Sequence, residues 1–271
     1  PTYVSYDATC PIHQENATLA LLYYADWEYA EPLWKEEIKK AVDYHFRTFN
    51  KAFWKRGNGW KHPFDRPAWC GVTNQDLIVI EALCLYGKIY NDFSLYEEWG
   101  KPVLDTLLSP FYYHEEYGNF RRGDGVNFVE RTAYYHVIIP SLKKIYECTG
   151  DERLPAVIDN VTKHLFDAFF IDDQGFTHLA WGAKTDPKDE SKVIGWINDP
   201  VTVSAYPLLL PILEDYVKKN PDPVREEQVK GLERTLAAYV FADGTIPLAL
   251  NPKKPLFNTV GSNNLWEYLI V

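Results

Sequence analysis

The sequence lacks several features that would assign it to a particular class of protein. Its 271 residues include no methionine, which predicts a processed, trimmed or incompletely recorded chain. No apolar run reaches the roughly 18 to 20 residues of a membrane-spanning helix. The first ten residues have neither the basic start nor the apolar stretch of a signal peptide, so any leader has been removed. In that case a secreted or periplasmic location is favoured.

Positive charge is also scarce. Lys and Arg total 28 against 38 Asp and Glu, which gives a formal net charge of -10. Because a polyanion is repelled by such a surface, general nucleic-acid binding is not expected. The sequence contains no GxGxxG, Walker, HExxH or GxSxG motif, and it specifies no metal or cofactor. The acidic pair Asp172-Asp173 precedes a turn and is not favoured as a metal site.

The four cysteines are Cys10, Cys70, Cys84 and Cys148, and they are far apart in the sequence. They form no CxxC or Cys/His spacing typical of a metal site. We expect core thiols, and a disulfide such as Cys10–Cys70 stays open.

Long helical stretches occur in pairs along the chain. The predicted pairs are 16–30 with 33–53, 74–91 with 94–109, 128–148 with 152–169, and 199–219 with 222–239. Thr149-Gly150-Asp151 is typical of a glycine C-cap followed by an acidic helix start, and Asn220-Pro221-Asp222-Pro223 marks another break. The loops 54–73, 110–127, 170–198 and 240–262 are long enough to be functional, and turns in the last two predict small β-hairpins.

The two helices of a pair differ in their patterns. Residues 77–85 are apolar nearly all round, which indicates a helix buried on every side. Helices 33–53 and 222–239 instead alternate apolar and charged positions, as outer helices do. Inner helices starting near residues 16, 74, 128, 199 and 262 therefore predict an all-α fold, an incomplete (α/α) toroid forming one domain over 1–271. The toroid is expected to be truncated within its fifth hairpin.

In such a ring the first residues of every inner helix meet at one face, which defines a candidate cleft. Helix capping is the alternative explanation for each Asn or Asp among these residues. The candidates are Glu15-Asn16, Asn74-Gln75-Asp76, Glu130-Arg131 with Tyr134-Tyr135-His136, Asn198-Asp199, and Asn263-Asn264.

The segment from Asp124 to His136 resembles the heparinase II/III-like polysaccharide lyases. Those enzymes carry an Asp-Gly turn followed by Glu-x-Ser/Thr-x-x-Tyr-His, and here Glu130, Thr132, Tyr135 and His136 fill these positions. They also open an earlier inner helix with Asn followed by His. Asn74 stands at that point here, but Gln75 replaces the His, and these residues do not include the β-sandwich that usually follows the toroid.

The resemblance implies β-elimination at a uronic acid. This chemistry removes the C5 proton beside a carboxylate, so a site must neutralise the carboxylate and hold a base against C5. Asn74 and Gln75 can donate neutral hydrogen bonds. Tyr135 can act as base and then as acid, with Arg131 or His136 favouring its ionised form. The alternative for Tyr135 is an ordinary inner-helix aromatic residue.

Basic and aromatic side chains in the loops indicate substrate binding. Arginines can hold carboxylates or sulfates, and indoles can stack on sugar faces. Solvated loops and the filling of apolar gaps are the alternatives. The predicted substrate-binding residues are Trp60, Trp69, Asp76, Arg121, Arg122, Trp181, Trp196, Asp199 and Asn263.

Three other functions stay open beside a polysaccharide lyase. The first is a glycoside hydrolase that uses two carboxylates among Asp65, Asp76, Glu130 and Asp199. The second is a cyclase or isomerase of an apolar substrate, and the third is glycan binding without turnover. The expected partner is an oligo- or polysaccharide, with neither nucleic acid nor membrane.

Overall fold

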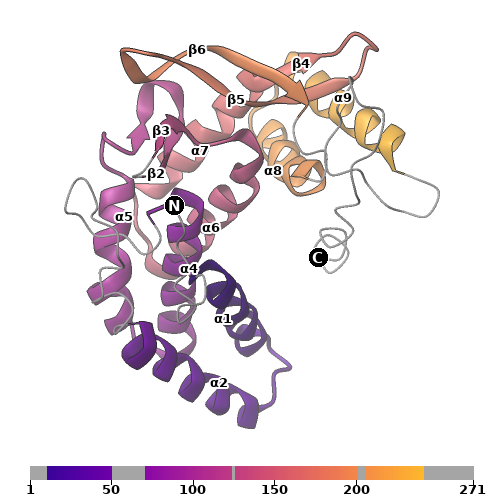
Figure 1. Cartoon of the computed structure of the whole chain (residues 1–271). Coiled ribbons are helices and arrows are strands. Elements are labelled where there is room, and N and C mark those ends of the chain that lie inside the picture. The colour runs from indigo at the N-terminus through magenta and orange to yellow at the C-terminus, as the bar shows by residue number, and fades with distance from the viewer. Residues whose placement is uncertain (1–10, 51–70, 124–125, 201–204, 241–271) are drawn as a thin grey trace. The chain divides into compact units, whose positions relative to one another are not determined.

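The computed structural model describes residues 11–50, 71–123, 126–200 and 205–240. Within them, helices follow one another in pairs, and short strands lie in the connections (Figure 1). The long helices are α1 (Pro11–Asp26), α2 (Pro32–Tyr44), α4 (Thr73–Tyr90), α5 (Lys101–Leu107), α6 (Tyr135–Thr149), α7 (Leu154–Leu165), α8 (Tyr206–Lys219) and α9 (Pro223–Tyr239). The predicted mostly helical fold with small antiparallel hairpins is confirmed.

Single turns of other helix types extend or precede several of these helices. They are the π turns η1 (His45–Asn50) and η3 (Tyr96–Gly100) and the 3₁₀ turns η4 (Glu115–Tyr117), η5 (Thr132–Tyr134) and η6 (Phe166–Ala168). The strands are β1 (Tyr113–His114), β2 (Asn119–Gly123), β3 (Val126–Val129), β4 (Phe169–Ile171), β5 (Thr177–Asp186) and β6 (Asp189–Pro200). They form two three-stranded sheets, ordered β1-β2-β3 and β4-β5-β6.

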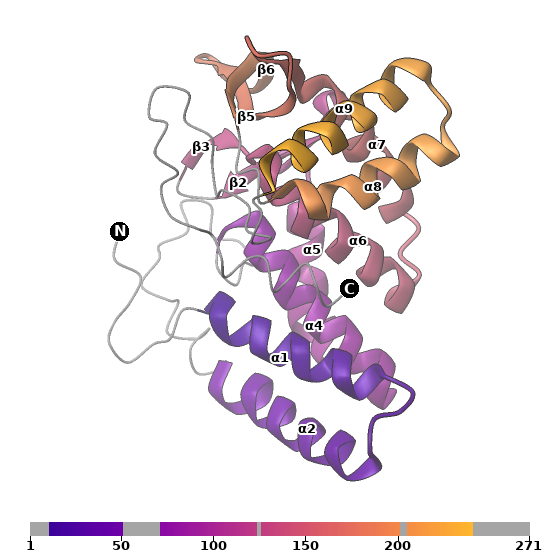
Figure 2. The ribbon, with the colours of Figure 1, turned by 90° about the vertical axis from the view of Figure 1, so that its right-hand side faces the viewer.

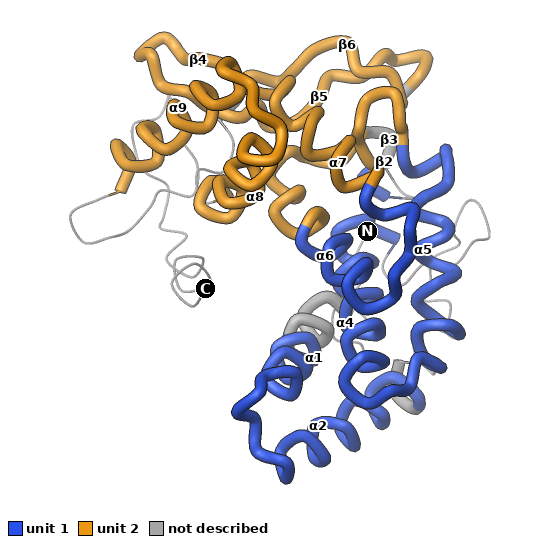
Figure 3. The backbone as a smooth tube through the Cα atoms, turned by 180° about the vertical axis from the view of Figure 1, so that it is seen from behind, with its two compact units in different colours: residues 1–113, 122–127, 140–155 blue, residues 114–121, 128–139, 156–271 orange. Residues whose placement is uncertain are grey.

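The chain divides into two compact units (Figure 3). Unit 1 comprises residues 1–113, 122–127 and 140–155. Unit 2 comprises residues 114–121, 128–139 and 156–271.

Helix α4 forms the core of unit 1. Its residues 77–86 are all buried, as expected for a helix that is apolar nearly all round. Helix α1 packs against both α4 and α2 (Figure 2). The outer helix α2 buries Ile38 and Val42 on one side and exposes most of its other residues, which confirms its predicted wet face.

A buried carboxylate lies in the middle of α4. Glu81 is 5% exposed and accepts hydrogen bonds from the Tyr23 hydroxyl on α1 and, at 2.6 Å, from the Ser141 hydroxyl on α6. Burial raises the pKa of Glu81, and the two hydrogen bonds partly offset this shift. Because an unpaired buried carboxylate is costly, these hydrogen bonds hold Tyr23 and Ser141 in one arrangement around it.

In unit 2, α8 and α9 form a hairpin, and β5 packs against α9. The turn predicted at 172–177 connects β4 to β5, with Phe170 opposite His178. His178 is fully buried. Its Nε2 lies 3.1 Å from Asp172 Oδ2, and its Nδ1 lies 3.1 Å from the Tyr206 hydroxyl at the start of α8. These contacts fix the hairpin to the helix.

Two predicted helix-boundary signals are confirmed, one at the end of α6 and one at the start of α9. α6 ends at Thr149, and Gly150 adopts a φ of 67°, a conformation that glycine reaches without strain. The side chain of Asp222 accepts hydrogen bonds from the backbone amides of Val224 and Arg225 at the start of α9. Such a cap satisfies amides that have no partner within the helix.

Three predicted inner-helix starts are wrong. Residues 126–129 form β3, so the third helix begins near Thr132 as a 3₁₀ turn and at Tyr135 as α6. Residues 199–200 end β6, and α8 begins only at Tyr206. α1 begins at Pro11, which places Glu15-Asn16 inside the helix. In the first two cases strand pairing overrides the cap-like polar residues, because β-branched and aromatic side chains fit a sheet.

The outer helices also differ from their predicted extent. The predicted helix 94–109 is helical from residue 94 to 107, with a π turn over Tyr96–Gly100 before α5. The predicted helix 33–53 changes from α to π geometry at His45. The predicted hairpin near 242–246, the fifth inner helix from 262 and the Cys10–Cys70 pairing lie outside the described residues.

Candidate functional site

The first turn of α4 carries three of the predicted polar residues in unit 1. Asn74 and Asp76 are buried, with 8% and 1% exposed, and Gln75 is half-buried. The N-cap position is Val72, with no side-chain cap, so capping does not explain Asn74. Within the described part of the chain, Asn74 Oδ1 is buried and has no hydrogen-bond partner. A buried acceptor of this kind is available to a ligand or a water molecule.

The residues of the lyase-like motif lie together in unit 2. Glu130, Thr132 and Tyr135 are each no more than 4% exposed, whereas Arg131 and His136 are half-buried. Glu130 Oε1 accepts a hydrogen bond from the Arg131 amide at 2.9 Å. The amide of Glu130 donates to the Phe120 carbonyl of β2 at 2.6 Å. These backbone bonds fix the Glu130 carboxyl in place just before α6.

Tyr135 has a structural contact that the sequence did not predict. Its hydroxyl oxygen accepts a hydrogen bond from the Phe120 amide at 3.0 Å, in a buried position. The phenol therefore ties the first turn of α6 to strand β2. A hydroxyl oxygen has two acceptor lone pairs, so this contact gives the phenol a structural role and leaves one lone pair for another donor.

Arg131 contacts one of the predicted tryptophans. Its guanidinium lies 4.5 Å from the centre of the Trp181 ring on β5, a cation–π arrangement. The contact holds the guanidinium over an indole of β5, and a guanidinium held in this way is preorganised to bind a carboxylate. His136 Nδ1 contacts the Ala133 carbonyl, so this ring is oriented by its own helix.

A small cavity of about 20 Å³ lies beside these residues in unit 2. That volume accommodates about one water molecule. Among the described residues that line it, Glu130 carries the carboxylate. The lining residues are Tyr117, Gly118, Asn119, Val129, Glu130, Thr132, Tyr135, Val161, His164, Leu165, Ala183 and Trp196.

Asn119 and His164 were not predicted from the sequence as site residues. Asn119 is 8% exposed, and its Oδ1 lies 2.9 Å from His114 Nδ1. His164 Nδ1 lies 2.8 Å from Asp167 Oδ2. His164 reaches the cavity from α7, remote in sequence from the motif, and Asn119 from β2, just before Asp124. The sequence offered no spacing signal that joined either residue to Glu130.

Other predicted residues fall into separate groups. Arg121 in unit 2 and Arg122 in unit 1 are neighbours on β2 and half-buried. Asp199 belongs to the end of β6 and not to a helix start. Trp60, Trp69, Asp65 and Asn263 lie outside the described residues. Because Asn74 belongs to unit 1 and Tyr135 to unit 2, their convergence on one cleft stays a prediction.

In the described ranges, no group of three or more His, Cys, Asp and Glu side chains is arranged to hold a metal ion. No helix in those ranges is long and apolar enough to cross a membrane.

Solved structures share the fold of this chain. They define the (α/α)-toroid class, in which helical hairpins follow one another, as they do here. No protein-family model matches the chain, and no curated protein matches it in sequence.

Three of the similar structures are carbohydrate-active enzymes. An unsaturated glucuronyl hydrolase from Bacillus sp. GL1, described as responsible for glycosaminoglycan degradation, matches with a TM-score of 0.59 at 13% identity, over 92% of this chain and 63% of that one. A glycosyl hydrolase family 88 protein from Bacteroides vulgatus matches with a TM-score of 0.60 at 11% identity, over 94% and 72%. A polysaccharide lyase matches with a TM-score of 0.56 at 13% identity, over 94% and 71%.

This chain spans 61% and 63% of the lengths of two unsaturated glucuronyl hydrolase structures that it matches. At such low identities the likeness shows the fold alone. The specific resemblance to heparinase II/III-like lyases stays a prediction.

Proposed function

We propose that this chain is a glycan-degrading enzyme that hydrolyses uronic-acid-containing saccharides, with Glu130 as the general base. The observation that carries the proposal is the one-water cavity lined by the buried Glu130 carboxylate. A carboxylate fixed beside a water molecule can take its proton as the oxygen attacks the anomeric carbon. The glycosidic C–O bond then breaks, and a general acid protonates the departing oxygen.

Hydrolysis also needs a general acid, and the carboxylates that the sequence offers besides Glu130 are Asp65, Asp76 and Asp199. Within unit 2, the Arg131 guanidinium lies over the Trp181 ring and supplies a positive charge for a uronate carboxylate. Similar structures that are hydrolases of uronate-containing glycans support the choice of hydrolysis.

Elimination is the second candidate function. It is favoured by the motif from Glu130 to His136 and by the similar polysaccharide lyase. Hydrolysis is placed first because the buried Glu130 carboxyl lines the one-water cavity, whereas the Tyr135 hydroxyl has a structural contact with the Phe120 amide.

The two reactions are separated by digestion of uronate polymers and their oligosaccharides in ¹⁸O-labelled water. Hydrolysis incorporates ¹⁸O at the new reducing end without new ultraviolet absorbance on a saturated substrate. Elimination produces an unsaturated uronate that absorbs, and it incorporates no label. Absorbance without label would refute hydrolysis, and neither signal on any substrate would refute both candidates.

Substitution then tests the assigned residue. Glu130→Gln keeps the shape of the side chain and is expected to reduce kcat by about 10²- to 10⁴-fold. Glu28→Gln is the matched control, because Glu28 is exposed in the α1–α2 connection. Equal activity in the two variants would show that Glu130 is not the base.

A further inference from the structure

A second cavity lies within unit 1, away from the first turn of α4. Its volume is about 540 Å³, within the range typical of small-ligand sites. Phe93 and Tyr96 follow the C-terminal end of α4, and Cys148 and Thr149 end α6. Because α4 has 18 residues, its two ends are about 27 Å apart. The cavity is therefore separate from the polar residues at the start of that helix.

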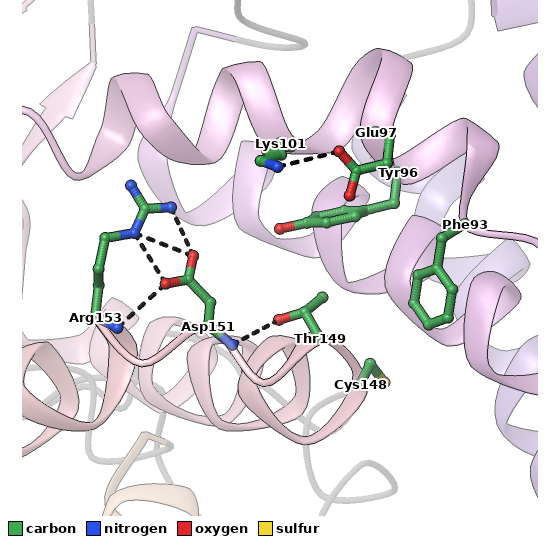
Figure 4. A pocket seen from close by; sticks show the side chains of 8 residues that line it. All are labelled: Phe93, Tyr96, Glu97, Lys101, Cys148, Thr149, Asp151 and Arg153. Carbon is green, nitrogen blue, oxygen red and sulfur yellow. Dashed lines mark hydrogen bonds and ion pairs between the residues drawn. The ribbon is translucent and has the colours of Figure 1, made fainter.

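The charged side chains of this cavity are paired with one another (Figure 4). Lys101 Nζ lies 3.2 Å from Glu97 Oε2, and an Arg153 Nη lies 2.6 Å from Asp151 Oδ2. Arg153 also pairs with Asp105 at 2.7 Å. Two cations thus stand against two carboxylates in the lining, and Asp105 outside it is a further partner of Arg153, so no unpaired cation in the lining favours an anion. The same groups present both donors and acceptors to a ligand.

Two aromatic rings form another part of the lining. Phe93 and Tyr96 meet edge to face, with centroids 6.5 Å apart and an interplanar angle of 81°. A Cβ atom on Gly87 would lie 2.5 Å from the Phe93 ring, and one on Gly100 would lie 2.8 Å from the Tyr96 ring. The two glycines therefore leave the space in which these rings are seated.

We propose that this cavity is an accessory binding site for a short neutral saccharide. Sugar hydroxyls both donate and accept hydrogen bonds, which matches the lysine–glutamate and arginine–aspartate pairs. The apolar C–H face of a sugar matches an aromatic ring such as Phe93. A neutral ligand also suits a lining whose two cations are already paired with carboxylates. This inference concerns binding, and it stands whether or not the proposed hydrolysis is correct.

Cys148 provides a reporter for this site. Its thiol is half-buried in the cavity wall, and burial raises its pKa to about 11. Alkylation by iodoacetamide at mildly alkaline pH, followed by peptide mass spectrometry, measures its reaction rate separately from that of other cysteines. Cellobiose and lactose are the probes, and methyl β-glucuronide is the anionic comparator. We expect a neutral disaccharide to slow alkylation at least threefold.

Two cavity variants and one control complete the test. Phe93→Ala removes an aromatic ring, and Arg153→Ala removes a hydrogen-bond donor. Protection is the ratio of the Cys148 alkylation rates without and with sugar, and each variant is expected to abolish it. Arg234→Ala is the control, because this exposed arginine pairs with Glu227 on α9 and should keep the protection. Three results would overturn the proposal: no protection by either neutral disaccharide, full protection in both cavity variants, or stronger protection by the glucuronide.

Discussion

The hydrogen bond from the Phe120 amide to Tyr135 predicts a measurable loss of stability in Tyr135→Phe. Both groups are buried, and the bond length is 3.0 Å. Removing the hydroxyl leaves a buried amide without that acceptor, which costs about 1–3 kcal/mol. For a chain of this size each kcal/mol lowers the Tm by about 2–4 °C, so the expected decrease is roughly 2–12 °C.

The assay is thermal unfolding followed by far-ultraviolet circular dichroism. Tyr44→Phe is the matched control, because Tyr44 is 64% exposed and the same atom is deleted there. Surface changes of this kind usually stay within about 0.5 kcal/mol. Hydrogen exchange of the peptide containing Phe120 gives a local measurement, and its protection is expected to fall in Tyr135→Phe only.

Equal melting temperatures for Tyr135→Phe and Tyr44→Phe would refute this reasoning. Unchanged exchange at Phe120 would contradict it independently. Activity should be compared per folded molecule, because a loss that only follows the folded fraction has a structural origin. A loss of kcat in fully folded Tyr135→Phe would instead support elimination with Tyr135 as the base.

Three further predictions concern stability. The pKa of Glu81 is raised in the folded protein, so the folded state binds this proton more tightly than the unfolded state does. Wild type should therefore lose stability relative to Glu81→Gln as the pH rises above about 4.5. Parallel curves of unfolding free energy against pH for the two proteins would contradict this. Burial lowers the pKa of His178, so the unfolded state binds more protons, and stability should fall as the pH decreases below about 6.5. Urea denaturation at several pH values should show this loss of unfolding free energy in wild type and a smaller loss in His178→Gln. Asp222→Ala should destabilise by about 0.5–2 kcal/mol in urea denaturation, whereas Asp222→Ser should recover most of the loss; an unchanged midpoint in Asp222→Ala would count against the cap.

The sequence predicted the helical hairpins because their signals are local. The apolar run at 77–85 identified the buried helix α4, and Gly150 and Asp222 marked chain positions where geometry leaves few choices. Errors occurred where distant partners decide the structure. Residues 126–129 pair with β2, and residues near 199 pair with β5, and neither pairing leaves a pattern within the segment itself.

The candidate site was predictable only in part for the same reason. The motif placed Glu130, Thr132 and Tyr135 near one another, and the structure brings all three to one small cavity. It did not reveal that Tyr135 is bound by the Phe120 amide, because that contact depends on the position of β2. Asn119 and His164 reach the cavity through tertiary packing, which a single sequence does not encode as a spacing.

The hairpin of β5 and β6 bears on how this protein behaves at high concentration. β6 lies at the edge of its sheet, and an edge strand can recruit a strand from another molecule. Its pairing with β5 is irregular after Ala180 and around Thr185, and the exposed Lys192 lies along it. An irregular edge with a protruding charge is a poor template for intermolecular pairing. These features favour colloidal stability, and substitutions that straighten β6 or remove Lys192 would lower the concentration at which the protein aggregates.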